Sequence, residues 1–221
     1  TIKGHMKESA GNEYMNESID GIAITVYATQ DTVESDSFTN QYDKNAAYPV
    51  VNVTELKEAL TNGGVVAVTK DIHTNNIEDT AAARIVISQP TTLNLEKKII
   101  TPDNMGNNNT NFCALIIDAD TTINAGKDGG IDTGVNGGYG INVRNGATLT
   151  INGGYYYGGG TAVQVQEGTL IINGGTFACE PYSSPTYGYN FLINCLDSAY
   201  KNGTAKVIIN GGTFVNFDPS N

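Results

Sequence analysis

A short phrase recurs three times in the second half of the chain. Each copy has an apolar run, then Asn-Gly-Gly, then an aromatic residue two positions beyond the second glycine. The copies align without gaps and cover residues 148–156, 169–177 and 206–214. Self-similarity of this kind is typical of solenoids, in which every repeat is one supersecondary unit that must stack on its neighbours to bury a core.

The same pattern of short strands continues upstream, with weaker turn sequences between them, and this gives five candidate coils. Their key asparagines are residues 94, 124, 152, 173 and 210, so successive spacings are 30, 28, 21 and 37 residues. Three short strands and three turns need roughly 20 residues, so we assign the excess to loops. The expected loops are Pro102–Thr110, Lys127–Gly138, Glu180–Tyr189 and Asp197–Thr204. Before each Asn-Gly-Gly phrase we expect another short strand. These strands are Gly140–Val143, Ala162–Val165 and Asn190–Ile193.

We therefore expect residues 50–221 to form an all-β fold, a right-handed parallel β-helix (solenoid). A strand of three to five residues cannot bury its inward face alone, but parallel neighbours about 4.8 Å above and below it can. Asn tolerates left-handed backbone, and its amide can bond to the same amide one coil away. The predicted amide ladder consists of Asn152, Asn173 and Asn210.

The aromatic residue of each phrase falls at an equivalent position. Because successive side chains of a strand point to opposite faces, Tyr156, Phe177 and Phe214 share one face. We place them inside the solenoid as a stack. The alternative for this row is an exposed surface that stacks on sugar rings.

A short capping helix is expected ahead of the first coil. Asn52 is placed to cap its first turn, Glu55 follows three residues later, and Gly63 ends it. Its apolar face would consist of Val53, Leu56, Ala59 and Leu60. The strand Val65–Thr69 would follow as the first coil. No second cap is evident after the last repeat, which is compatible with a natural protein that continues further.

Composition excludes several classes of partner and site. The formal net charge is −11 with only 12 Lys and Arg, so a nucleic-acid partner is excluded. No apolar run approaches the roughly 20 residues of a membrane span, and no signal peptide opens the chain. Cys113, Cys179 and Cys195 are odd in number and lack metal-ligand spacing, so we expect buried thiols and no cofactor.

Residues 1–49 have a different sequence pattern. We interpret them as an N-terminal extension or linker with one clearly indicated strand, Asp20–Tyr27. Three segments there, Lys7–Tyr14, Ile22–Gln30 and Asp36–Asp43, resemble the closing stretch of the camelysin/TasA-type exported proteins of Gram-positive bacteria. The resemblance covers about a fifth of the chain. It implies the remnant of a jelly-roll domain that forms fibres or biofilm matrix at the cell surface. The protease activity once attached to that family would need a zinc motif such as HExxH, and the sequence has none.

Residues 50–221 resemble the pectate-lyase-like β-helix superfamily, in particular the Asn-Gly-Gly-Thr-Phe repeats of gut bacterial surface proteins and phage appendages. The likeness implies the fold but no function, because β-helices host lyases, hydrolases, adhesins and spikes.

Two groups of acidic residues are candidates for chemistry. Asp118, Asp120 and Arg144 would form the acid-plus-guanidinium groove of a polysaccharide-active lyase or hydrolase, with Gln166 at the same corner of the next coil. The alternative for this row is a surface charge ladder that stabilises the fold weakly. Asp128 and Asp132 lie in a glycine-rich loop, where either a calcium ion or simple solvation would explain them.

The leading hypothesis is a non-enzymatic, extracellular structural or adhesive protein, a display rod that joins a fibre-forming domain. Its partners would be host or matrix glycans or proteins, and it would self-associate into fibres. Exposed aromatic contacts are expected from loop tyrosines. They are Tyr182, Tyr187 and Tyr189. The alternatives are the polysaccharide-active enzyme above and a phage tail or head appendage that trimerises through its rod.

Overall fold

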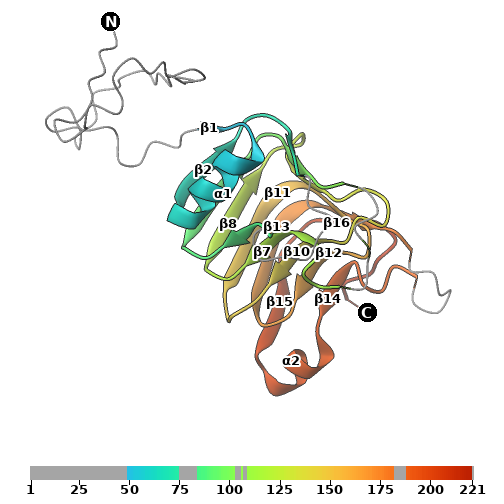
Figure 1. The fold of residues 1–221 in the computed structure, drawn as a ribbon. Coiled ribbons are helices and arrows are strands. Elements are labelled where there is room, and N and C mark those ends of the chain that lie inside the picture. Colours follow the sequence, from blue (N-terminus) through green and yellow to red (C-terminus); the bar gives the residue numbers. More distant parts are fainter. Residues whose placement is uncertain (1–48, 75–83, 103–105, 107–108, 182–187, 221) are drawn as a thin grey trace, which may run out of the picture. The chain divides into compact units, whose positions relative to one another are not determined.

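The structure is a computed structural model that describes residues 49–74, 84–102, 106, 109–181 and 188–220. The chain divides into two compact units, Thr1–Asp36 and Ser37–Asn221, and every described residue belongs to the second. The expected strand Asp20–Tyr27 and the camelysin-like segments lie outside the described residues. The described part is rich in strands, with few helices, and all of its strand pairings are parallel (Figure 1).

Five strands form the smaller sheet, in the order β14-β12-β10-β7-β4. Their bounds are β4 Val86–Ile87, β7 Cys113–Ile117, β10 Tyr139–Val143, β12 Thr161–Val165 and β14 Ile193–Cys195. Neighbours in this sheet come from successive repeats and are in register, so Val143 pairs with Ile117 on one side and with Val165 on the other.

Eleven strands form the larger sheet, which consists of two ladders joined by the long strands β11 and β13. The first ladder contains β1 Pro49–Val50, β2 Gly64–Val68, β5 Thr91–Leu95, β8 Thr121–Ala125, the first half of β11 Thr148–Gly158, the first half of β13 Gly168–Cys179, and β15 Ala205–Ile209. The second contains β3 Ile72–His73, β6 Lys98–Ile100, β9 Gly130–Asp132, the second halves of β11 and β13, and β16 Thr213–Phe214.

The core is built from side chains that alternate along these strands and stand on one another across them. Leu93, Ile123, Ile151 and Ile172 occupy one register column, and all are fully buried. Burying such a side chain stabilises the fold by about 1.5–3 kcal/mol relative to leaving it in water. Because one strand cannot enclose these residues, the column forms only when successive repeats lie side by side.

The aromatic residues of the repeated phrase form an interior stack. The rings of Tyr156 and Phe177 lie 5.1 Å apart at 14°, and those of Phe177 and Phe214 lie 5.3 Å apart at 10°. Tyr156 and Phe177 are fully buried, and Phe214 is partly buried. The Tyr156 hydroxyl donates to the Gly153 carbonyl at 2.8 Å, so its polar atom is satisfied inside the core.

A continuous chain of side-chain amides runs along the outside of the first ladder. Each Nδ2 donates to the Oδ1 of the asparagine one repeat earlier, with distances between 2.8 and 3.0 Å. The members are Asn94, Asn124, Asn152, Asn173 and Asn210. The ladder therefore contains the three asparagines that the sequence places in it and extends two repeats further upstream.

The capping helix is α1, Val53–Asn62. The Asn52 side chain accepts a hydrogen bond from the Glu55 backbone N–H at 3.0 Å, and Gly63 ends the helix with φ 74°. Leu56 and Leu60 are fully buried, and Val53 and Ala59 pack against the core. A Glu55 carboxylate oxygen accepts from the Val51 N–H, so it reaches one residue further back than a capping box does.

Three expectations about loops and strand ends are wrong. The expected loop Lys127–Gly138 contains β9, whose three residues pair with β6 and β11. The expected loop Asp197–Thr204 contains the short helix α2, Asp197–Asn202, which ends at Gly203 with φ 80°. The strand expected at Asn190–Ile193 begins only at Ile193, because the preceding residues form a turn in which the Leu192 N–H bonds to the Tyr189 carbonyl.

Candidate functional site

The structure brings Asp118 and Arg144 together at neighbouring corners of the smaller sheet. Arg144 Nε donates to Asp118 Oδ1 at 2.9 Å, and Nη2 donates to Oδ2 at 2.7 Å. Asp118 follows β7 and Arg144 follows β10, so the parallel register aligns them. The hydrogen bond to Asp118 raises the pKa of Arg144, although partial burial acts in the opposite direction. Both oxygens of this carboxylate are therefore engaged in a two-pronged ion pair.

Asp120 does not join this pair. Its Oδ1 accepts a hydrogen bond from the Thr148 backbone N–H at 2.8 Å, on the larger sheet. Gln166 is aligned with Arg144 in the strand register, but its Oε1 accepts from Asn142 Nδ2 at 3.1 Å. The three residues suggested for an enzyme are thus divided between an ion pair and a separate backbone contact.

The two aspartates proposed for calcium face lysines. Asp128 Oδ2 lies 3.9 Å from Lys97 Nζ, and Asp132 Oδ2 lies 3.4 Å from Lys98 Nζ. Asp132 Oδ1 accepts from the Gly134 N–H at 3.1 Å. Within the described ranges, no group of three or more His, Cys, Asp or Glu side chains is placed to hold a metal ion. The geometry thus favours solvated ion pairs at these positions.

Of the three loop tyrosines, Tyr182 and Tyr187 lie outside the described residues. Tyr189 is partly buried and packs against the core. Two further tyrosines that the sequence analysis did not select, Tyr155 and Tyr157, point outward on either side of buried Tyr156. Lys98 Nζ lies 4.9 Å from the centroid of the Tyr155 ring, a cation–π contact.

The cysteines are thiols rather than cystines. Cys113 and Cys179 are buried, Cys195 is partly buried, and none forms a disulfide within the described part of the chain. Burial raises the pKa of Cys179 to about 11, with a further contribution from Glu180. A thiol with so high a pKa is a poor nucleophile near neutral pH.

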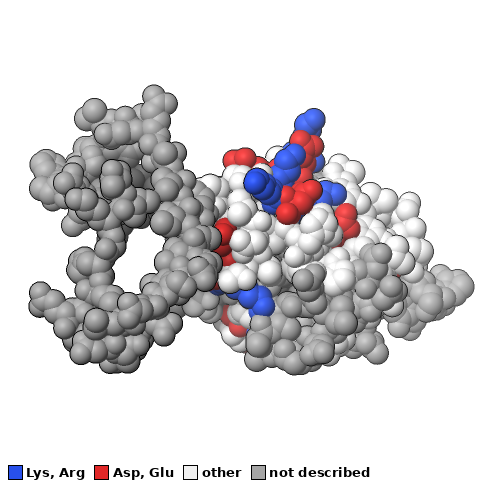
Figure 2. Space-filling view, turned by 45° about the horizontal axis from the view of Figure 1, so that its top comes forward, with Lys and Arg blue, Asp and Glu red and all other residues white. Residues whose placement is uncertain are grey.

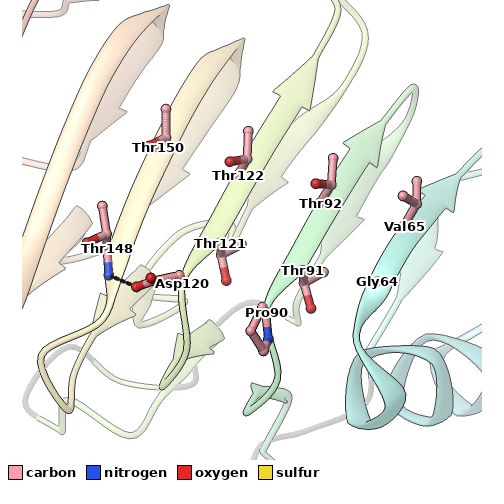
Figure 3. Close-up of a pocket in the computed structure, with 10 residues that line it drawn as sticks. All are labelled: Gly64, Val65, Pro90, Thr91, Thr92, Asp120, Thr121, Thr122, Thr148 and Thr150. Carbon is pink, nitrogen blue, oxygen red and sulfur yellow. Dashed lines mark hydrogen bonds between the residues drawn. The ribbon is translucent and has the colours of Figure 1, made fainter.

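The outer face of the larger sheet carries an open hollow of about 470 Å³, which we call the threonine groove. It is lined by Gly64, Val65, Pro90, Thr91, Thr92, Asp120, Thr121, Thr122, Thr148 and Thr150. The parallel register places Val65, Thr92, Thr122 and Thr150 in one row across β2, β5, β8 and β11. Figure 3 shows this row pointing to one side of the sheet, while Thr91 and Thr121 point to the other.

The threonines of the groove differ in the use of their hydroxyls. The Thr91 hydroxyl donates to the Gln89 carbonyl, and the Thr121 hydroxyl donates to the Ala119 carbonyl, both at 2.8 Å. The hydroxyls of Thr92, Thr122 and Thr150 make no hydrogen bond within the described part of the chain. The outward row is therefore a set of evenly spaced polar groups that remain available to a ligand.

Charge is nearly absent from the groove. Asp120 is the one ionisable residue in its lining, although the whole chain has a formal net charge of −11. Figure 2 shows Lys and Arg side chains gathered beside Asp and Glu side chains, whereas most of the other described surface in that view is uncharged. The groove is thus suited to neutral, hydrogen-bonding ligands.

The groove was not among the features predicted from the sequence, although the sequence contains a pattern that indicates it. Each outward threonine lies two residues before a ladder asparagine, as in Thr92-Leu-Asn94, Thr122-Ile-Asn124 and Thr150-Ile-Asn152. Because side chains two apart on a strand share a face, the three phrases predict parallel rows of hydroxyls and amides.

Comparison with protein-family models, curated proteins and solved structures gave no match for this chain. The resemblances to the camelysin/TasA-type proteins and to the pectate-lyase-like superfamily therefore stay predictions. Neither helix in the described ranges has the length and apolar character that a membrane crossing requires.

Proposed function

We propose that this chain is a non-enzymatic structural or adhesive module, built as a right-handed parallel β-helix and displayed outside a Gram-positive cell. The observation that carries the proposal is the parallel pairing of successive repeats, traced by five ladder asparagines. Repeats that contact only their neighbours along one axis build an extended body, which suits a display rod.

The engagement of Asp118 supports a structural role for the charged corner. Glycoside hydrolysis needs two carboxylates that flank one glycosidic bond, about 5–10 Å apart. Instead, both carboxylate oxygens of Asp118 accept hydrogen bonds from Arg144, and Asp120 accepts one from the Thr148 N–H. An ion pair between adjacent repeats fixes their register, which is a task of a scaffold.

The N-terminal segment supports the extracellular setting, through its resemblance to exported matrix proteins. In this proposal residues 1–49 connect the rod to a fibre-forming domain, and the rod presents surfaces to glycans or proteins of the host or matrix. Self-association into fibres would follow from that upstream domain. The module would need no cofactor.

Turnover assays on neutral and acidic polysaccharides test the non-enzymatic part. We expect no release of reducing ends and no unsaturated lyase product from the wild-type chain. The informative variant is Asp118→Asn, and Asp197→Asn is its control because the exposed Asp197 side chain forms an ion pair with the exposed Lys201 of α2. Cleavage that disappears in Asp118→Asn but persists in Asp197→Asn would establish an enzyme instead.

Two further observations test the architecture and the setting. A crystal structure of the whole chain should give right-handed coiling of the successive repeats. The natural reading frame upstream of Thr1 should encode an export signal and jelly-roll strands. Repeats that coil with the opposite hand would contradict the right-handed β-helix, and an upstream frame without an export signal would contradict the extracellular setting.

A further inference from the structure

The outward threonines present polar atoms that the protein does not use. Thr92, Thr122 and Thr150 are partly buried, and their hydroxyls lack partners in the described ranges. Each hydroxyl can donate one hydrogen bond and accept two. Neighbouring strands are about 4.8 Å apart, so the row spans about 10 Å along the stacking axis. That length is comparable with a pair of linked sugar rings.

The amide ladder adds a second row on the same face. In the ladder Asn124 and Asn152 each use one N–H and one oxygen lone pair, which leaves one of each for an external partner, and Asn94 at the end of the ladder uses only an oxygen lone pair. Asn94, Asn124 and Asn152 lie two residues beyond the three threonines, on the same side of their strands. Together the rows form a grid of neutral donors and acceptors that repeats once per strand.

Asp120 supplies a charged acceptor at the edge of this grid. Its Oδ1 is held by the Thr148 N–H at 2.8 Å, which fixes the carboxylate. Its Oδ2 has no partner in the part of the chain that the structure describes. A fixed carboxylate oxygen accepts strong hydrogen bonds from hydroxyl groups.

We propose that the threonine groove binds a neutral glycan chain, laid along the stacking axis across β5, β8 and β11. The inference rests on the proposed adhesive function and names the ligand class for it. Threonine hydroxyls and ladder amides bond to the sugar hydroxyls, Asp120 accepts from one of them, and threonine methyl groups contact the C–H faces of the rings. A groove volume of about 470 Å³ is within the usual range of ligand sites.

The charge of the groove selects among glycans. No Lys or Arg lines it, and its one charged group is acidic. An acidic polysaccharide would meet a chain of net charge −11 with no cation at the contact, so it is disfavoured. Neutral glycans incur no such repulsion.

The test uses the whole chain and soluble polysaccharides, with β-glucan, mannan and galactan as neutral probes and polygalacturonate as the acidic one. Binding is measured by affinity electrophoresis and calorimetry. The central variant is Thr92→Val/Thr122→Val/Thr150→Val, which removes three hydroxyls and keeps β-branched side chains. Thr169→Val is the matched control, because Thr169 points outward from β13 but does not line the groove.

We expect wild type and Thr169→Val to bind at least one neutral probe equally, and the triple variant to bind it about tenfold more weakly or worse. The corresponding triple Thr→Ser variant should recover most of the loss, and Asp120→Asn should weaken binding while it keeps the Thr148 contact. Thermal melts by circular dichroism establish that each variant is folded.

The outcomes separate the two proposals. Equal binding by wild type and the triple variant would overturn the groove and leave the adhesive function standing. A groove-dependent interaction accompanied by release of reducing ends would support the groove and overturn the non-enzymatic function. Absence of binding to every neutral probe would overturn the proposal that the groove binds a glycan. A triple variant that changes only self-association, measured by light scattering, would also overturn it, in favour of a second copy of the chain as the occupant of the groove.

Discussion

The two faces of β5 and β8 both carry threonine, but the hydroxyls on the two faces have different roles. On the inward side, the buried hydroxyls of Thr91 and Thr121 are satisfied by the carbonyls of Gln89 and Ala119. One residue further along each strand, the hydroxyls of Thr92 and Thr122 face outward and have no partner in the described ranges. Burial forces a hydrogen bond on the first pair, whereas water can satisfy the second.

This contrast separates the residues that hold the fold together from those that are available to a ligand. Inward residues are fixed by the packing column beside them, so their replacement should cost stability and little else. Outward residues contribute little to packing, so their replacement should affect binding and leave the fold intact. Each of the following variants compares an inward position with an outward one, or tests the boundary between them.

The largest effect is expected in the aromatic stack. Phe177→Ala removes a fully buried ring that lies between Tyr156 and Phe214, and it should lower the free energy of unfolding by about 3–5 kcal/mol. Thr176→Ala, one residue away on the outward side of β13, should change it by about 0.5 kcal/mol or less. Urea unfolding followed by circular dichroism measures both. Similar losses in the two variants would contradict the assignment of faces.

A smaller effect separates the two threonines of β8. Thr121→Val removes the hydroxyl of a buried residue that donates to the partly buried Ala119 carbonyl, which should cost about 1–2 kcal/mol. Thr122→Val removes a hydroxyl with no described partner and should cost about 0.5 kcal/mol or less. Chemical unfolding of the two variants side by side checks the difference. A larger loss for Thr122→Val would mean that its hydroxyl is structural.

The amide ladder should show a position effect. Asn152→Ala breaks bonds to both Asn124 and Asn173, whereas Asn210→Ala breaks only the bond to Asn173. We expect about 1 kcal/mol for the interior position and about half of that for the end, because these amides are exposed. Equilibrium unfolding resolves the pair if each curve is measured in replicate. An end position as costly as the interior one would speak against a continuous ladder.

The smallest effect concerns alkaline pH. Burial, followed by the charge of Glu180, raises the pKa of Tyr157 to about 12, against about 10 in an unfolded chain. Between these two pKa values the folded state keeps the Tyr157 phenol proton and the unfolded state does not. The contribution of Tyr157 to the free energy of unfolding is therefore full below pH 10 and declines as pH rises toward 12. Tyr157→Phe should therefore lose less stability than wild type over this range. Parallel melts between pH 9 and pH 12 provide the check, and identical slopes would exclude the effect.

Much of the architecture can be predicted from the sequence because the repeat carries it. An Asn-Gly-Gly phrase followed by an aromatic residue fixes a ladder position and an inward ring, although in β11 and β13 the phrase lies within a continuous strand, at a shift of register, and not at a turn. Asn173 and Phe177 therefore take the places that the phrase assigns them. The helix α1 follows from local rules as well, since Asn52 and Gly63 are a strong start and stop.

The rest depends on contacts that the local sequence does not reveal. Strand β9 has three residues and one apolar side chain, Ile131, so its strand character comes from its neighbours β6 and β11. Helix α2 has Leu196 at its N-cap position, where no side chain caps the first turn, so the usual sequence signal for a helix start is absent. The groove was missed because threonine is common in strands for its β-branched shape, and the sequence does not show whether a hydroxyl is satisfied.

A high-resolution crystal structure of the whole chain tests the central claim most directly, through the side-chain amides of residues 94, 124, 152, 173 and 210. If the repeats stack as described, these amides form one unbroken chain of Nδ2 to Oδ1 hydrogen bonds, each near 2.8–3.0 Å. Amides that lie on separate surfaces, without mutual contact, would contradict the stacking of repeats and with it both proposals.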